Sequence, residues 1–204
     1  MSYLFQGLTM GLAYVAPIGV QNLFVINAAL TCPRRRALAT AVIVIFFDVS
    51  LALACFFGIG AVLEAFPKVR LVVLLVGSLV VLTIGVGLLR SKVGQEGGTP
   101  LPDTIPKIIA TACVVTWCNP QALLDGTMML GAFRATLPAG QSALFIGGVA
   151  LASCLWFSGL TLVVSLLSRC FTPKVMGVIN KVCGVVILFY GGKLLWSFVT
   201  LVAQ

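Results

Sequence analysis

Six long apolar stretches, separated by shorter polar connections, dominate this chain. They cover residues 3–30, 37–63, 70–90, 107–133, 142–168 and 175–202. Each exceeds the ~20 residues that an α-helix needs to cross the hydrocarbon of a bilayer. The pattern predicts an all-α integral membrane protein with six transmembrane helices, of which the first and fourth are long enough to be broken internally.

Prolines interrupt the first and fourth stretches at about membrane mid-depth. Pro17 and Pro120 each precede a polar side chain by five residues, Asn22 in the first case and Asp125 in the second. A proline removes a backbone donor and clashes with the preceding turn. The freed backbone groups must then be satisfied by protein or water. Paired breaks in the two halves of a chain are typical of a solute-binding site in a transporter. The other polar or flexible residues beside the breaks are Gly19, Gln21, Asn119 and Gln121.

The polar segment 91–106, rich in glycine and proline, divides the chain into halves of three predicted spans each. We interpret residues 1–204 as one transporter domain with repeats at 1–90 and 107–204. Gly77 and Gly85 in the third stretch align with Gly184 and Gly192 in the sixth. Three spans per half force the second copy to enter the membrane upside down, which predicts a 3+3 inverted repeat.

Composition supports the membrane assignment. The chain is 60% hydrophobic and only 9% charged, whereas soluble domains are about a quarter charged. Its net charge of +8 is explained by basic residues that face the cytoplasm and anionic lipid, so nucleic-acid binding is not expected. Residues 1–15 lack the basic region of a signal peptide, and we expect the first stretch to be a true span.

Basic residues between the spans predict the orientation. The 1–2, 3–4 and 5–6 connections contain nine lysines and arginines, and the opposite side contains only Lys68, Arg70 and Arg134. Because basic loops stay in the cytoplasm, both termini are predicted to lie outside it.

Two aspartates lie inside apolar stretches. Asp48 is flanked by Phe47 and Val49 near the middle of the second stretch, where a charge costs about 2.5–3.5 kcal/mol on insertion scales. Asp48 and Asp125 could be structural, as an ion pair with Lys193 or as caps of a helix break. They could equally be cation-binding or proton-coupling carboxylates in an aqueous cavity. Because the positive end of a restarting helix attracts a carboxylate, the combination predicts a site for a small zwitterion with excess positive charge.

The sequence lacks the residues that metal binding, cofactor binding or enzymatic catalysis would require. The seven cysteines form no CxxC pair and the chain has no histidine, so neither a metal site nor a cofactor is expected. A membrane aspartyl protease would use two carboxylates, but neither Asp48 nor Asp125 has the usual Gly-x-Gly-Asp context. We therefore expect no enzyme. Trp117, Trp156 and Trp196 are interpreted as packing or interfacial anchors, and Tyr14 is close enough to Pro17 to line the site.

The motifs resemble those of the lysine/arginine exporter family, the LysE/ArgO type of the LysE superfamily. The resemblance is carried by Pro-x-Gly-x-Gln-Asn from Pro17 to Asn22, by Asp48, and by Trp-x-Asn-Pro-x4-Asp from Trp117 to Asp125. It covers essentially the whole chain. The sequence departs from the family pattern at Val20, where a second proline is usual, and at Gln121, where histidine is frequent.

The resemblance implies a multi-pass secondary exporter of L-lysine or L-arginine in the bacterial inner membrane, driven by the membrane potential or a proton gradient. Asp48, Asp125, Asn22, Gln21, Asn119 and Gln121 would bind the substrate. Gln21 and Asp125 favour the basic-substrate branch over the homoserine/threonine exporters, and lysine versus arginine stays open. An exporter of a neutral amino acid or of an inorganic cation is the alternative, and a homodimer is a possible assembly.

Overall fold

The computed structural model describes residues 2–17, 19–58, 65–90, 104–138, 140–167 and 173–202. In these residues all regular structure is helical. The helices are α1 (Tyr3–Val15), α2 (Val20–Thr31), α3 (Arg34–Phe57), α5 (Pro67–Arg90), α6 (Ile105–Trp117), α7 (Pro120–Gly126), the π-helix η1 (Thr127–Gly131), α8 (Ala132–Thr136), α9 (Ser142–Leu166) and α10 (Pro173–Val202). Most of the polar segment 91–106 lies outside the described residues.

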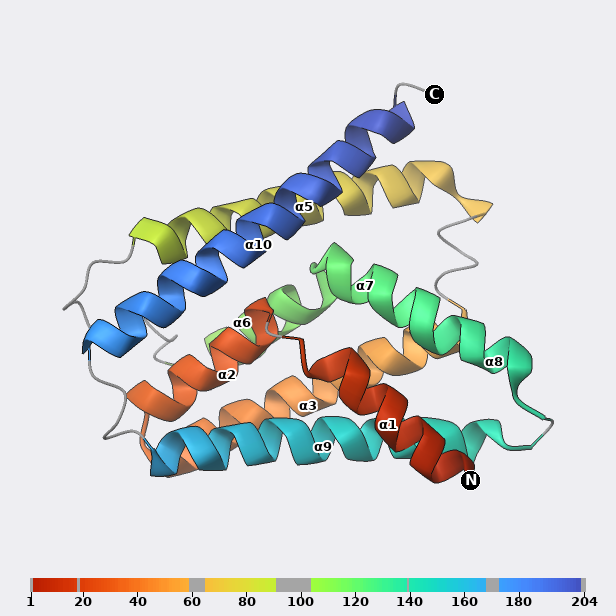
Figure 1. Cartoon of the computed structure of the whole chain (residues 1–204), viewed down its shortest axis with the longest axis horizontal. Coiled ribbons are helices and arrows are strands. Elements are labelled where there is room, and N and C mark those ends of the chain that lie inside the picture. Colours follow the sequence, from red (N-terminus) through yellow and green to blue (C-terminus); the bar gives the residue numbers. More distant parts are fainter. Residues whose placement is uncertain are drawn as a thin grey trace.

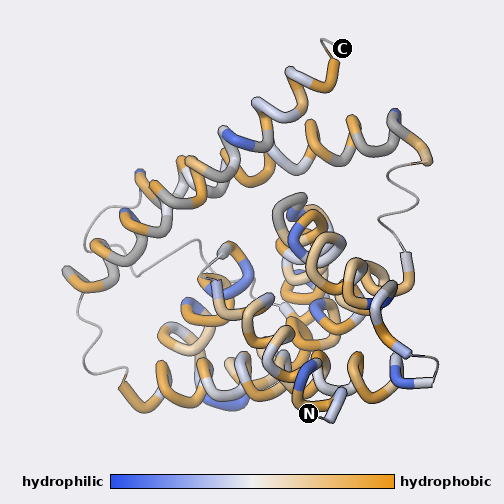
Figure 2. Tube along the Cα trace, turned by 45° about the vertical axis from the view of Figure 1, so that its right-hand side comes forward, coloured by the Kyte–Doolittle hydropathy of each residue, from blue (hydrophilic) through white to orange (hydrophobic). Residues whose placement is uncertain are grey.

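Two of the described helices, α3 and α9, are long and apolar enough to cross a membrane by themselves. A third span exists if α1 and α2, which meet at 81°, are counted as one broken span. Hydrophobic residues run along all the helices (Figure 2). Large apolar side chains also cover the outside, where Phe46 and Phe189 are 67% and 71% exposed. Such a surface suits lipid rather than water, so the chain is a helical membrane protein, and the count of six spans stays a prediction.

The helices form two layers (Figure 1). Helices α5 and α10 pack along each other and lie across one side of a bundle made by the remaining helices. Val81 of α5 and Ile187 of α10 pack on Val20, Leu23 and Val115 of the bundle. This contact joins the middle of the α5–α10 pair to the region where α1 gives way to α2.

Glycines bring α1 and α9 into backbone contact. A Cβ atom added at Gly7 would collide with the carbonyl oxygen of Phe145, and one added at Gly148 with that of Leu4. At Gly11 an added Cβ would lie 2.7 Å from the Cβ of Ala152. Small residues permit this approach, which is a common way for helices to associate in lipid.

Glycines also lie at the α5–α10 contact. An added Cβ at Gly85 would meet Ile187 and Leu188, and one at Gly191 would meet Val81 and Leu82. An added Cβ at Gly192 has nothing within 4 Å, so Gly191 rather than Gly192 faces α5. The alignment of Gly85 with Gly192 as repeat positions stays a prediction.

The two interruptions in the bundle use their prolines differently. Helix α1 ends at Val15 and α2 begins at Val20, so Pro17 lies between the helices. Helix α6 ends at Trp117 and Pro120 is the first residue of α7. A proline is tolerated at a first helical position because its missing N–H would have no intrahelical partner there. The backbone N–H groups of Leu23 and Leu123 begin the new ladders by donating to the carbonyls of Gly19 and Asn119.

The chain following α7 continues through the π-helix η1 into α8. At the end of α8, Arg134 Nη1 donates a 2.7 Å hydrogen bond to the carbonyl of Phe57, and the guanidinium lies 5.3 Å from the centre of the Phe57 ring. Phe57 is the last residue of α3, where unpaired carbonyls carry partial negative charge. Arg134 thus caps α3 and holds α8 beside it.

Candidate functional site

A buried carboxylate lies at the centre of the bundle. Asp48, in the middle of α3, is only 1% exposed. Its Oδ1 accepts a 3.1 Å hydrogen bond from Gln21 Nε2, and its Oδ2 accepts a 2.6 Å bond from Ser153 Oγ. Asp48 therefore joins the start of α2, the middle of α3 and the middle of α9, and it faces the protein interior rather than lipid.

Neutral donors alone stabilise Asp48 in the part of the chain that the structure describes. Each hydrogen bond to a charged group contributes about 1.5–3 kcal/mol. The two bonds to Asp48 together therefore offset the ~3 kcal/mol cost of placing an aspartate in the membrane. Gln21 is also the second residue of α2, near that helix's positive end. The carboxylate offers about four acceptor positions, and the two bonds leave capacity for a cationic ligand.

Asp48 does not form the suggested ion pair with Lys193 among the described residues. Lys193 lies on α10 and is exposed, whereas Asp48 is enclosed by α2, α3 and α9. The two side chains belong to different layers of the fold. Within the described residues Asp48 is a negative charge without a basic partner.

The side chain of Asn22, the third residue of α2, bridges the break between α1 and α2. Its Nδ2 donates to the carbonyls of Val15 and Pro17 at 3.1 and 2.8 Å, and its Oδ1 accepts a 2.8 Å bond from Trp156 Nε1 of α9. The last carbonyls of a helix lack intrahelical partners, and Asn22 supplies one for the end of α1. The Asn22 amide is thus engaged in holding the break, and its contact with substrate stays a prediction.

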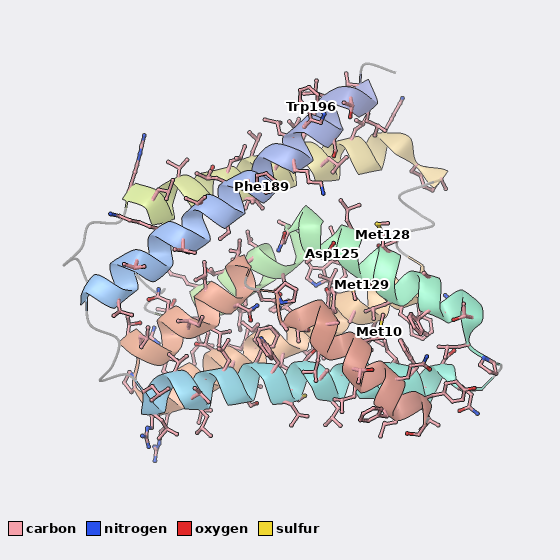
Figure 3. The ribbon with its side chains drawn as sticks, viewed as in Figure 1. Met10, Asp125, Met128, Met129, Phe189 and Trp196 are labelled. Atoms are coloured by element: carbon pink, nitrogen blue, oxygen red, sulfur yellow. The ribbon has the colours of Figure 1, made fainter. Side chains whose placement is uncertain are left out.

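We expect Trp156→Phe to loosen this break. The change keeps an aromatic ring but leaves Asn22 Oδ1 without its donor, which costs about 1–3 kcal/mol for a buried polar group. The purified protein should therefore lose its folded state at a lower temperature, and transport per folded molecule should fall. Trp196→Phe is the matched control, because Trp196 is 70% exposed on α10 (Figure 3). Equal stability of the two variants would contradict this role for Trp156.

A second acidic residue lies on α7. Figure 3 shows Asp125 on the side of α7 toward α1, whereas Met128 points toward the α5–α10 pair. Asp125 is half-buried. Tyr14, in the last turn of α1, packs against the clusters that contain Val44 and Ala52, which lie one helical turn before and after Asp48 on α3. Its ring also faces Gly126, the residue after Asp125. Tyr14 therefore lies between the part of α3 that contains Asp48 and the part of α7 that contains Asp125.

The remaining predicted residues line the two interruptions. Pro17 and Gly19 lie between α1 and α2, and Gly19 is the N-cap of α2. Asn119 lies between α6 and α7. Gln121 belongs to α7, but its side chain lies outside the described residues, as does that of Pro120. Of the predicted binding residues, Gln21 and Asp48 are in direct contact.

Sequence reasoning missed two members of this site. Ser153 and Trp156 come from α9, whose apolar run offered no charge or proline to mark them. Trp156 is among the tryptophans interpreted from the sequence as packing or interfacial anchors, and its indole N–H also donates a hydrogen bond to Asn22. Their separation of three residues puts both on one face of a helix, which is the signal that could have linked them.

Comparisons with known proteins agree with this picture. Residues 12–197 match the family described as LysE type translocator. The arginine exporter protein ArgO of Enterobacter sp. (strain 638) is 35% identical over 199 residues, which is 95% of this chain and 93% of that protein. ArgO of Klebsiella pneumoniae (strain 342) is 34% identical, over 95% of this chain and 93% of that protein. ArgO of Escherichia coli (strain K12) is 34% identical, over 92% and 90%.

No solved structure matches this chain. The family match nevertheless extends over nearly the whole sequence and includes every residue of the site described above. The chain belongs to the LysE type translocator family and is a membrane transporter rather than an enzyme.

Proposed function

We propose that the protein exports basic L-amino acids, with L-arginine as the principal substrate and L-lysine as the second candidate. The observation that carries this proposal is the buried Asp48 carboxylate, held by Gln21 and Ser153 and without a basic partner among the described residues. Such a group attracts a cation small enough to enter the bundle. The relatives named arginine exporters favour arginine over lysine.

The substrate would lie beside the break between α1 and α2. Its cationic side chain would bind between Asp48 and Asp125, which belong to the parts of α3 and α7 that lie on either side of Tyr14. Its α-carboxylate would face the start of α2, where the first backbone N–H groups have no intrahelical partners. Asn22 would contribute indirectly, because its amide holds the broken backbone in place.

A 3+3 inverted repeat with helices broken near Pro17 and Pro120 would supply alternating access. The contacts of Gly85 with Ile187 and of Gly191 with Val81 mean that α5 and α10 run antiparallel, which an inverted repeat requires of its third and sixth spans. The bond between Asp48 and Ser153 supports a site at the junction of the halves, since α3 and α9 belong to different repeats. Rocking of one half against the other would open this junction to each side in turn.

Export of a cation needs an energy source other than the potential alone. An inside-negative potential opposes the outward movement of positive charge by ~2.3 kcal/mol per 100 mV. We therefore favour antiport, in which a proton moves inward as arginine moves outward. Asp48 is the candidate carrier of that proton, because one carboxylate would bind either the proton or the cationic substrate.

The expected location is the bacterial inner membrane. In Figure 1 both termini lie toward the same end of the molecule, together with the end of α3 and the start of α9. The other end contains the start of α3, where Arg34 and Arg35 are exposed. Positive residues prefer the cytoplasm, so this arrangement supports termini on the opposite side.

Export by cells tests the proposal directly. Cells without their own arginine exporter are loaded with an arginine-containing dipeptide, and external arginine is followed with and without this protein. We expect faster release of arginine, slower release after the proton gradient is collapsed, and little effect on threonine. Release of threonine but not arginine or lysine would instead favour a neutral-substrate exporter. Unchanged release of all three would overturn the proposal.

A further inference from the structure

The Tyr14 hydroxyl is a buried polar group without a hydrogen-bond partner among the described residues. Its ring packs between the two apolar clusters around Val15 and Phe56. Helix α1 ends one residue later, at Val15. Tyr14 thus belongs to the last turn of α1, before the break where the substrate is proposed to bind.

Gly126 of α7 leaves room for the Tyr14 ring. A Cβ atom added at Gly126 would lie 2.8 Å from Cys55 Sγ and 3.3 Å from Tyr14 Cε2. Only a glycine after Asp125 therefore lets α7 approach Tyr14 and Cys55 this closely. The absence of a side chain at position 126 brings the backbone next to Asp125 against the tyrosine ring.

An unpaired buried hydroxyl is costly. Leaving such a group unsatisfied costs about 1–3 kcal/mol, and buried polar groups in folded proteins are nearly always bonded. A tyrosine kept in this position, between the parts of α3 and α7 that contain Asp48 and Asp125, is best explained by a partner that is present only when the transporter is loaded.

We propose that the Tyr14 hydroxyl is a substrate ligand that favours a guanidinium group over an ammonium group. This inference rests on the proposed function and names a determinant of its specificity. The hydroxyl oxygen accepts an N–H of the guanidinium while the carboxylates of Asp48 and Asp125 balance its charge.

The preference follows from the number of donors. A guanidinium presents five N–H groups in a rigid plane, whereas an ammonium presents three that rotate freely. In the proposed site the substrate cation meets the carboxylates of Asp48 and Asp125, and an ammonium can direct all its donors toward them. A planar guanidinium spans a wider arc, so it gains more from a third acceptor such as the Tyr14 hydroxyl.

The test is Tyr14→Phe, which removes only the hydroxyl. Wild-type and variant proteins are purified and reconstituted into vesicles, and uptake into the vesicles is measured as a function of arginine and lysine concentration. The half-saturating arginine concentration should rise about tenfold, as expected for losing one hydrogen bond to a charged group. The value for lysine should change by less than about threefold, since the carboxylates remain.

Tyr3→Phe is the matched control, because Tyr3 is at the other end of α1, and it should change neither value. The thermal stability of Tyr14→Phe should not fall, since no bond of the empty protein is lost. Three results for Tyr14→Phe would each overturn the inference but not the proposed function. They are an unchanged half-saturating concentration of arginine, an equal change in the value for lysine, and loss of folded protein. A wild-type protein that transports no arginine would overturn the proposed function and the inference with it.

Discussion

Asp48→Asn should abolish arginine export while leaving the protein folded. The asparagine has the same shape, and its amide can still bond to Gln21 and Ser153, which hold the carboxylate in the native protein. What disappears is the negative charge. Removing one member of a buried charge pair costs about 2–5 kcal/mol, so we expect at least about a thirtyfold loss of transport.

Initial rates of arginine release, divided by the amount of folded transporter in the membrane, measure this effect. Asp103→Asn is the control, since it removes the same charge from the polar segment 91–106. That variant should export at the wild-type rate. Arginine export by Asp48→Asn within a factor of three of wild type would remove Asp48 from the site.

Gly148→Ala should be strongly destabilising. The new methyl group would collide with the carbonyl oxygen of Leu4 and lie 2.7 Å from the backbone nitrogen of Leu8. Backbone atoms cannot rotate aside, so α1 and α9 must separate. Overpacking typically costs about 1–3 kcal/mol, and this contact with backbone falls at the upper end of that range.

The neighbouring Gly147 provides a sharp control, because an added Cβ there has nothing within 4 Å. Gly147→Ala should be neutral or stabilising by up to about 1 kcal/mol, since alanine is the better helix former. The comparison uses the temperature at which each detergent-purified protein loses its monodisperse form. A Gly148→Ala protein as stable as Gly147→Ala would show that α1 and α9 do not approach as closely as described.

Asp48 could be identified from the sequence as a candidate site residue because it is a lone charge in an apolar stretch. A single ionisable residue in such a context is costly wherever it points, so its presence signals a function without knowledge of the fold. Its partner Gln21 could also be predicted, since it follows the proline break. Ser153 could not, because a serine costs little in a membrane helix and many have no specific role.

The two prolines show a different limit. Pro17 and Pro120 have similar sequence surroundings, but one lies between helices and the other begins a helix. Proline is compatible with both positions, so its identity does not decide between them. The glycines of α10 behave likewise, since Gly191 and Gly192 are adjacent and only packing places Gly191 rather than Gly192 against α5.

The π-helix from Thr127 to Gly131 has a consequence for how this region tolerates change in length. A single π turn accommodates one residue more than the equivalent α turn. The π turn absorbs that extra residue locally. Asp125 before it and Arg134 after it can therefore both keep the direction in which their side chains point. Loss of one residue here would convert the wide turn into an ordinary one with both flanks undisturbed, whereas the same deletion within α3 or α9 would rotate every side chain beyond it by about 100°.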